Sequence, residues 1–373
     1  MRETFLIFLR LGCTSFGGPV AHIGYFRSEF VERRRWLDEK AYAGVVGFCQ
    51  FLPGPTSSQV AMALGQMRAG APGLIAAFIG FTLPSALLMV LFAFFLHGTN
   101  APWVHGLKLA AVAVVALALW RMATTLTPDL LRLGFAGAAA MLALLLPSQI
   151  GQLAAIALGA ALGVALLKPP PMTARPSSAP RHALPLLALF FLLLAVLPLI
   201  APLDHRLALF DAFYRTGALV FGGGHVVLPL LQHAVVTPGW IGNAPFMAGY
   251  GAAQAMPGPL FSFAAYLGAA IGGWSTALLC LLAIYLPSLL LVAGGWPLWQ
   301  AVTHHRFLRA ALAGVNAAVV GLLAAALWSP VITGAVFSPA DAALALAALG
   351  LLFLAVPSWL VVGLCALAAV WLH

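Results

Sequence analysis

The chain has 373 residues, of which 63% are hydrophobic and only 7% are charged. A soluble domain carries about 25% charged residues because its whole surface meets water, so the composition excludes an ordinary soluble protein. The net charge of +9 comes mostly from scattered basic residues, which fit loops that meet anionic lipid headgroups. We therefore expect the lipid bilayer as a partner and no nucleic acid.

Continuous apolar stretches predict an all-α polytopic membrane protein, because a helix satisfies its own backbone groups in lipid. In chain order the candidate segments are 4–25, 41–66, 72–97, 106–126, 130–147, 149–167, 184–202, 207–232, 245–270, 273–295, 308–328, 338–356 and 357–372. A Pro/Ser/basic stretch at 168–181 can be neither helix nor membrane segment. The prediction is about 13 transmembrane segments. They form a first repeat at 1–167, a linker with one extra helix at 168–206 and a second repeat at 207–373.

The two halves repeat the same residue types in the same order. Arg10, Phe16 and Gly17-Gly18 return as Arg215, Phe221 and Gly222-Gly223; Gln50, Pro53-Gly54-Pro55 and Leu83-Pro84-Ser85 return as Gln254, Pro257-Gly258-Pro259 and Leu286-Pro287-Ser288. Composition alone does not reproduce Arg, Gln and Pro-Gly-Pro at a nearly constant offset. If every segment spans, the halves face opposite ways, as in many secondary transporters. We expect such inverted repeats; parallel repeats would follow if the Gly-Gly segment enters and returns on one side.

Acidic residues are absent from most of the apolar core: none lies between Lys40 and Asp129, or between Asp211 and Asp341. Cation pumps and intramembrane hydrolases need carboxylates at membrane depth to bind a metal or activate water. A nucleotide-binding Gly-x-x-x-x-Gly-Lys-Ser/Thr motif is also absent from the sequence. We therefore expect no metal, no cofactor and no enzymatic activity, such as turnover of a lipid or isoprenoid. The predicted function is transport of an anionic or neutral substrate, driven by a gradient or by a partner.

Each Pro-Gly-Pro interrupts a segment near its middle, because proline removes a backbone donor and glycine adds conformational freedom. A second half-helix can then begin at Pro55 with hydroxyls in its first turn. Its free N–H groups and positive dipole end would form an oxyanion site, although a simple kink or close packing is the alternative. The residues of this predicted site are Gly54, Pro55, Thr56 and Ser57, with Gly258 and Ser262 in the second half.

Glycine pairs, arginines and histidines extend the predicted site. Successive glycines can form an anion nest or allow close helix packing. A guanidinium binds oxyanions with a planar fork or anchors a helix at the headgroups. His22 and His225 lie near the glycines and are proton-coupling candidates, although a structural role fits them too. The added substrate-binding candidates are Arg10, Gly17, Gly18, Arg215, Gly222 and Gly223.

The segment Phe16-Gly17-Gly18-Pro19-Val20-Ala21-His22, followed by Trp36-Leu37 and Gln50-Phe51-Leu52-Pro53-Gly54-Pro55, resembles the chromate ion transporter family in its long, two-domain form. The resemblance covers essentially the whole chain. It implies a secondary transporter of the bacterial inner membrane that expels chromate and gives chromate resistance, with sulfate as a related or competing anion. It also implies roles for the motif residues, including Phe16, Pro19, Pro53, Pro257 and Pro259.

The residues alone predict a small oxyanion and no specific one. A carrier of sulfate or another small oxyanion, working in either direction, is therefore the alternative. The sequence leaves the oligomeric state open, with a homodimer as one of the assemblies it allows.

Overall fold

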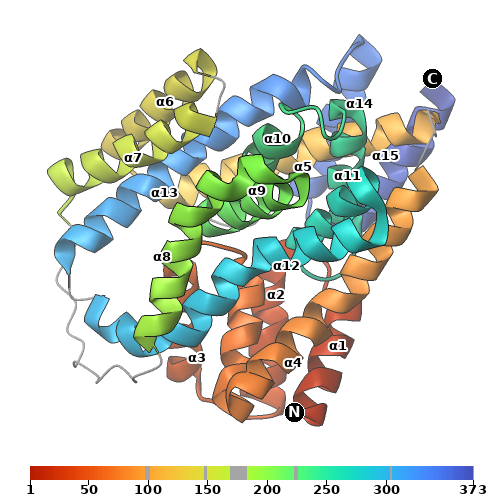
Figure 1. The fold of residues 1–373 in the computed structure, drawn as a ribbon. Coiled ribbons are helices and arrows are strands. Elements are labelled where there is room, and N and C mark those ends of the chain that lie inside the picture. Colours follow the sequence, from red (N-terminus) through yellow and green to blue (C-terminus); the bar gives the residue numbers. More distant parts are fainter. Residues whose placement is uncertain (97–100, 147–148, 169–182, 222–225, 303–304, 373) are drawn as a thin grey trace.

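The computed structural model describes residues 1–96, 101–146, 149–168, 183–221, 226–302 and 305–372 (Figure 1), with Val20 and 296–302 described by their backbone alone. This part of the chain is all-helical and contains no strand. In chain order the elements are α1 (Arg2–Thr14), α2 (Gly18–Arg27), η1 (Ser28–Arg33), α3 (Glu39–Phe51), α4 (Thr56–Leu96), α5 (Pro102–Leu126), α6 (Leu130–Leu145), α7 (Gln149–Leu166), α8 (Ala183–Ile200), η2 (Ala201–Leu203), α9 (His205–Leu219), α10 (Val227–Val235), α11 (Asn243–Ala255), η4 (Leu260–Ser262), α12 (Phe263–Val302), α13 (Arg306–Ala326), η5 (Leu327–Ile332), α14 (Pro339–Phe353) and α15 (Ser358–Leu372).

Five helices of the described chain are long and apolar enough to cross a membrane. They are Thr56–Leu96, Pro102–Leu126, Ala183–Leu203, Leu260–Gly295 and Arg306–Ile332. Shorter apolar helices occupy Leu130–Leu145, Ile150–Leu166, Pro339–Phe353 and Ser358–Leu372. The chain is thus a multi-pass membrane protein, whereas the prediction of 13 spans is not confirmed. α1, for example, has 13 residues, or about 20 Å of helix, which is less than the ~30 Å thickness of the hydrocarbon core.

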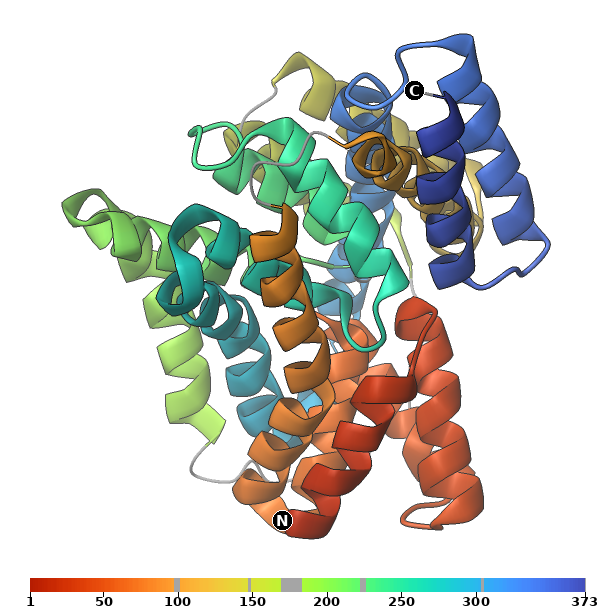
Figure 2. The ribbon, with the colours of Figure 1, turned by 90° about the vertical axis from the view of Figure 1, so that its right-hand side faces the viewer.

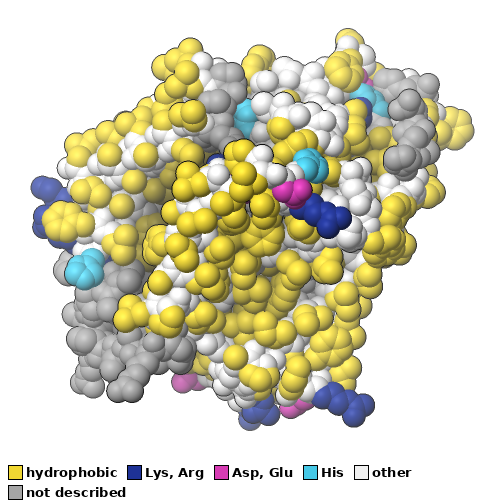
Figure 3. Space-filling model, in the orientation of Figure 1, with side chains coloured by type: hydrophobic (Ala, Val, Ile, Leu, Met, Phe, Trp, Pro, Cys, Tyr) yellow, Lys and Arg dark blue, Asp and Glu magenta, His cyan; other side chains and the backbone are white. Residues whose placement is uncertain are grey.

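The outer surface suits lipid. Figure 3 shows hydrophobic side chains over most of the visible face, with the basic and acidic side chains in a few small groups. α8 is the plainest case, since Leu184, Phe191 and Leu199 are each more than 60% exposed. Exposing such side chains to water would be unfavourable, so this helix packs against lipid on its outer side.

α4 folds back on itself. Gly65 and Ala77 are twelve residues apart, about 18 Å along a straight helix, yet a Cβ on Gly65 would lie 2.6 Å from the Cβ of Ala77. The reversal occurs at Ala69 and Gly70, where Gly70 has a φ of +62° that glycine adopts readily. α4 is therefore a tight hairpin with a short limb, 56–68, and a long limb, 71–96.

α12 repeats this hairpin in the second half. Gly273 has a φ of +76°, and a Cβ on Gly268 would lie 2.6 Å from the Cα of Ala277. The long limbs also pack alike, because a Cβ on Gly12 of α1 would lie 2.7 Å from the carbonyl oxygen of Phe81 in α4. Figure 2 shows α1 (red) beginning beside the fold-back of α4 (orange) and rising alongside it. The equivalent glycine of α9, Gly217, meets the backbone of Ile284 in α12 in the same way.

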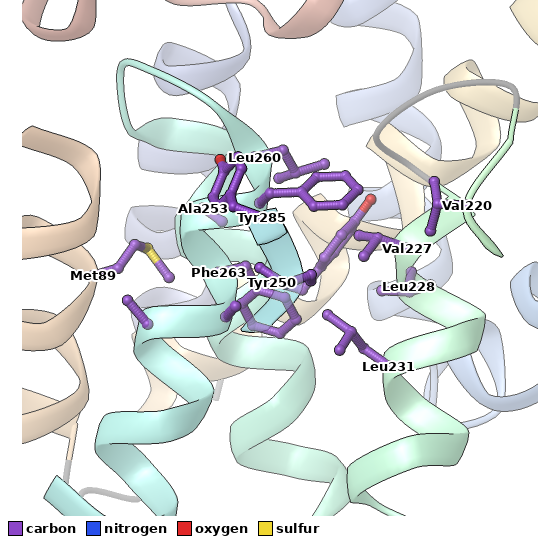
Figure 4. Packing of buried hydrophobic residues seen from close by; sticks show 14 of the residues in the cluster. Met89, Val220, Val227, Leu228, Leu231, Tyr250, Ala253, Leu260, Phe263 and Tyr285 are labelled. Atoms are coloured by element: carbon purple, nitrogen blue, oxygen red, sulfur yellow. The ribbon is translucent and has the colours of Figure 1, made fainter. Parts of the chain in front are cut away.

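The main hydrophobic core is shared by the two halves. It joins side chains of α1, α3, α4 and α5 to those of α9 to α13. Figure 4 shows Met89 of α4 on one side and Tyr250, Phe263 and Leu231 of the second half on the other. The interrupted segments of both halves therefore meet inside one packed body.

Candidate functional site

Both Pro-Gly-Pro segments interrupt a helix. α3 ends at Phe51 and α4 begins at Thr56, and Gly54 between them has a φ of +121°. In the second half α11 ends at Ala255, and Gly258 has a φ of +94°. These left-handed conformations cost a side chain-bearing residue free energy, so glycine is required at both turns.

The two turns are held by reciprocal hydrogen bonds between the halves. The Gly54 N–H donates to the carbonyl of Val220 over 2.7 Å, and the Gly258 N–H donates to the carbonyl of Ser15 over 2.8 Å. Ser15 and Val220 occupy equivalent positions, each directly before a Phe-Gly pair. Each half thus supplies the acceptor that the other half's turn requires. We term the region formed by residues 15–18, 52–59, 220–221 and 256–262 the junction.

The first turn of α4 brings buried hydroxyl groups to the junction. Thr56, Ser57 and Ser58 are all less than 9% exposed. The hydroxyl of Tyr285 on α12 lies within interaction range of the Ser58 and Thr82 hydroxyls. Within the described chain none of the oxygens of Ser58, Thr82 and Tyr285 forms a hydrogen bond of regular geometry.

Gln59 ties this cluster to the Pro-Gly-Pro turn. Its Nε2 donates to the carbonyl of Pro53 over 2.6 Å and to the Ser288 hydroxyl of α12 over 3.1 Å. The Pro53 bond fixes the amide orientation, and Oε1 is left without a partner among the described residues. Two hydrogen bonds therefore tie this region to the second half. Gly54 of the Pro-Gly-Pro turn donates to Val220, and Gln59 at the start of α4 donates to Ser288.

These groups suit a small oxyanion. A buried polar atom without a partner costs about 1–3 kcal/mol, so several such atoms together call for a ligand or an ordered water. Hydroxyl donors at the start of a half-helix, where the dipole is positive, stabilise negative charge. No group of three or more His, Cys, Asp or Glu side chains that could hold a metal ion occurs in the described residues.

Most of the predicted Pro-Gly-Pro site lies at the junction. Gly54, Pro55, Thr56, Ser57, Gly258 and Ser262 are all buried there. Ser262 uses its hydroxyl locally, donating to the carbonyl of Pro259 over 2.8 Å. Gln59, Thr82, Tyr285 and Ser288 were not assigned from the sequence. The sequence does indicate Thr82 and Tyr285 as candidates, because they occupy equivalent positions directly before the repeated Leu-Pro-Ser.

The first glycine pair opens α2 at the edge of the junction. Gly17 and Gly18 have φ values of +95° and +76°. Phe16 is half-buried and its ring centroid lies 6.3 Å from that of Trp359. The second set of predicted residues, Gly222, Gly223 and His225, lies outside the described residues.

His22 adjoins the junction. It is fully buried, and its Nε2 lies 3.2 Å from the Ser15 carbonyl oxygen, the same atom that accepts from Gly258. Its ring meets that of Phe81 edge to face. His22 therefore helps to hold the acceptor that closes the second turn.

The two equivalent arginines are both ion-paired. Arg10 is half-exposed and contacts Glu29 over 2.6 Å, and Glu29 also accepts from Arg33 and Arg34. Arg215 forms an ion pair with Asp211. The structure thus gives each arginine a buried carboxylate partner. Of the two partners, only Asp211, at i and i+4 with Arg215, could have been found from sequence spacing.

Glu29 lies on η1, outside the five long spans. Burial alone would raise the pKa of its carboxyl group. Hydrogen bonds from Arg34 and Arg33 and the charge of Arg10 outweigh this effect and hold the pKa below the ordinary 4.5. Glu29 is therefore charged at neutral pH and neutralises part of the surrounding basic cluster.

Comparison with known proteins assigns the chain to a family. The model described as "Chromate transporter" matches residues 2–164 and 207–370. The chain is 28% identical over 336 residues to the "Probable chromate transport protein" of Synechococcus elongatus, covering 87% of this chain and 83% of that one. It is 27% identical over 336 residues to the "Chromate transport protein" of Pseudomonas aeruginosa, covering 87% and 79%. No solved structure matches. These relatives are named as transport proteins, which supports transport and not catalysis, and the chain belongs to the chromate transporter family.

Proposed function

We propose that this protein is a secondary transporter that exports chromate across the inner membrane of a bacterium and thereby confers chromate resistance. The observation that carries the proposal is the junction itself. Two halves, each matched by the chromate transporter model, meet where a half-helix begins among buried hydroxyls without partners. Chromate is a small tetrahedral oxyanion, which such donors can bind.

The substrate site in this proposal is the first turn of α4 together with Tyr285. Backbone N–H groups and the hydroxyls of Ser58 and Thr82 would replace the hydration shell of the anion without placing a full positive charge beside it. A site without a fixed countercharge releases its anion more easily, as transport requires. Arg10 and Arg215 lie apart from this cluster and would attract the anion toward it.

The alternation of access is proposed to follow from inverted repeats. The long limb of α4 runs toward the upper right of Figure 1 and that of α12 toward the lower left, which supports an inverted arrangement. Midplane sites between inverted repeats open to one side at a time. The reciprocal bonds of Gly54 and Gly258 offer two equivalent closures, one for each side.

The test is the chromate content of cells that express the intact protein, the Tyr285→Phe variant, the Arg10→Ala variant or no transporter, at low and high sulfate. Export predicts less chromate in cells with the intact protein than in cells without a transporter. Loss of this effect in Tyr285→Phe would support the junction as the anion site, and loss in Arg10→Ala would support a role of Arg10 in transport. An increase that sulfate suppresses would instead mean uptake of sulfate-like anions. No difference, with the protein shown to be in the membrane, would remove chromate from the proposal.

A further inference from the structure

A separate cavity adjoins the junction between α7, α9 and α10. It is partly open to the outside, and about 330 Å³ not filled by atoms lies within its bounds, the open solvent at its mouth included. Apolar walls come from all three helices (Leu153, Leu219 and Leu230), and the polar lining residues include Gln152, Arg215 and Thr216. Leu219 directly precedes Val220, whose carbonyl accepts from Gly54. A ligand here would therefore lie against the helix end that closes the first turn.

Arg215 and Asp211 form the charged part of this cavity. Arg215 donates to Oδ2 of Asp211, and their side chains are 27% and 2% exposed. The second carboxylate oxygen, Oδ1, and the Nε of Arg215 have no hydrogen-bond partner in the described chain. The guanidinium thus can be reached by a solute, while the carboxylate is buried with half of its acceptor capacity unused.

The other polar groups of the cavity are already engaged. Gln152 donates to the carbonyl of Pro229 over 3.2 Å, and Thr216 donates to that of Ala212 over 2.8 Å. Arg215 is consequently the cavity's cationic donor for an incoming anion.

Few titratable groups face this pair from the surrounding elements. In the described residues α7 and α8 carry none, α10 carries His233, and α12 carries Tyr266, Cys280 and Tyr285. On α9 itself and its cap the others are Asp204, His205, Arg206 and Tyr214, and Tyr214 donates to the carbonyl of Phe190. Asp211 is therefore the carboxylate whose charge depends most directly on Arg215.

We propose that Asp211 and a small oxyanion compete for the guanidinium of Arg215, so that anion binding in this cavity is accompanied by uptake of one proton. When the anion takes the guanidinium, the buried carboxylate loses its partner. An uncompensated buried charge is strongly unfavourable, so Asp211 takes a proton from the aqueous phase onto a carboxylate oxygen. By linkage, protonation of Asp211 raises the affinity for the anion by the same factor by which the bound anion raises the proton affinity of Asp211. The inference rests on the proposed transport of an oxyanion and names its coupling ion and the residue that carries it.

The experiment measures chromate binding to the purified full-length protein in detergent by equilibrium dialysis across neutral and mildly alkaline pH. In the intact protein the Kd should rise with pH by up to about tenfold per pH unit more than in Asp211→Asn, which is the limit for linkage to one proton. The protonation of chromate itself contributes equally to both proteins. Arg215→Gln should remove this excess pH slope and weaken the pH-dependent part of the binding about tenfold or more, while binding at the hydroxyl groups of the junction remains. An equal pH slope in the intact protein and Asp211→Asn would overturn the proposal.

Controls separate this outcome from a general effect of removing a carboxylate. Asp129→Asn removes an exposed carboxylate that caps a helix. Glu29→Gln removes the buried carboxylate that pairs with Arg10, which lies outside the cavity. Both variants should keep the full pH slope. If Asp211→Asn does not fold, proton uptake by the intact protein decides. Chromate added in weak buffer at mildly alkaline pH should take up close to one proton per bound anion, and none contradicts the proposal. A folded intact protein that binds no chromate would instead refute the proposed function.

Discussion

Gly54 is the position where one added methyl group tests the junction most directly. Its φ is +121°, and a Cβ there would overlap the Ser288 hydroxyl and lie 2.7 Å from Nε2 of Gln59. The left-handed backbone costs an alanine about 1–2 kcal/mol, and the added bulk in a packed site costs about 1–3 kcal/mol. We therefore expect Gly54→Ala to lower the free energy of unfolding by about 2–4 kcal/mol. The assay is denaturation by SDS in mixed micelles, followed by circular dichroism.

Two companion variants separate strain from overlap. Gly273→Ala should cost only the backbone term, about 1–2 kcal/mol, because Gly273 also has a positive φ but a Cβ added there would meet no atom of the described chain within 4 Å. Combining Gly54→Ala with Ser288→Ala removes the hydroxyl that the methyl group meets, so the two changes should couple favourably by about 1 kcal/mol. Equal losses in Gly54→Ala and Gly273→Ala, with no coupling to Ser288, would refute the close approach of the two halves at this turn.

Three further variants test other parts of the site. Tyr285→Phe should leave the free energy of unfolding within about 0.5 kcal/mol, because its hydroxyl forms no hydrogen bond of regular geometry in the described chain, yet lower chromate transport about tenfold. Tyr214→Phe removes a hydroxyl bound to the Phe190 carbonyl, so it should lose about 1 kcal/mol of stability and keep transport. The reverse pattern would contradict the assignment of the anion site to Tyr285. Glu29→Gln should lower the free energy of unfolding by about 1–2 kcal/mol at neutral pH, the low end for hydrogen bonds to a charged group, because Arg10 and Arg33 are half-exposed or more. Because the folded-state pKa of Glu29 is lowered, this stabilisation is complete above the ordinary value of 4.5 and disappears as the pH falls through the lower pKa, so a gap that persists in acid would contradict it. His22→Gln keeps a hydrogen-bond donor for the Ser15 carbonyl and removes the titratable imidazole. Chromate transport and its pH dependence should therefore survive. Loss of the pH dependence alone would assign proton coupling to His22.

The interruptions at Gly54 and Gly258 could be predicted because proline and glycine act on the local backbone. The all-helical class followed from composition for a similar reason, since the solvent decides which secondary structure is possible. The internal repeat could be recognised from the sequence because Arg10, Phe16 and Pro53 recur as Arg215, Phe221 and Pro257. These are features that neighbouring residues along the chain determine.

The remaining features depend on contacts between distant residues. The break between the predicted segments 41–66 and 72–97 lies at the fold-back of α4, but no local pattern shows that Gly65 packs against Ala77 across it. Arg10 was expected at the substrate, and its partner Glu29 lies nineteen residues away on another element. The Tyr285 cluster likewise joins two halves whose relative placement no local pattern contains.

The reciprocal closure of the two turns also has a consequence for the order in which the molecule forms. The acceptor for Gly54 is Val220, which leaves the ribosome long after the first repeat has been synthesised. Until then the first turn holds an amide without its final acceptor, in an environment where such a group is costly. Completion of that turn must therefore wait for the arrival of α9. The first repeat is therefore synthesised before its own centre can be finished, and each of the two turns is complete only when both repeats are present.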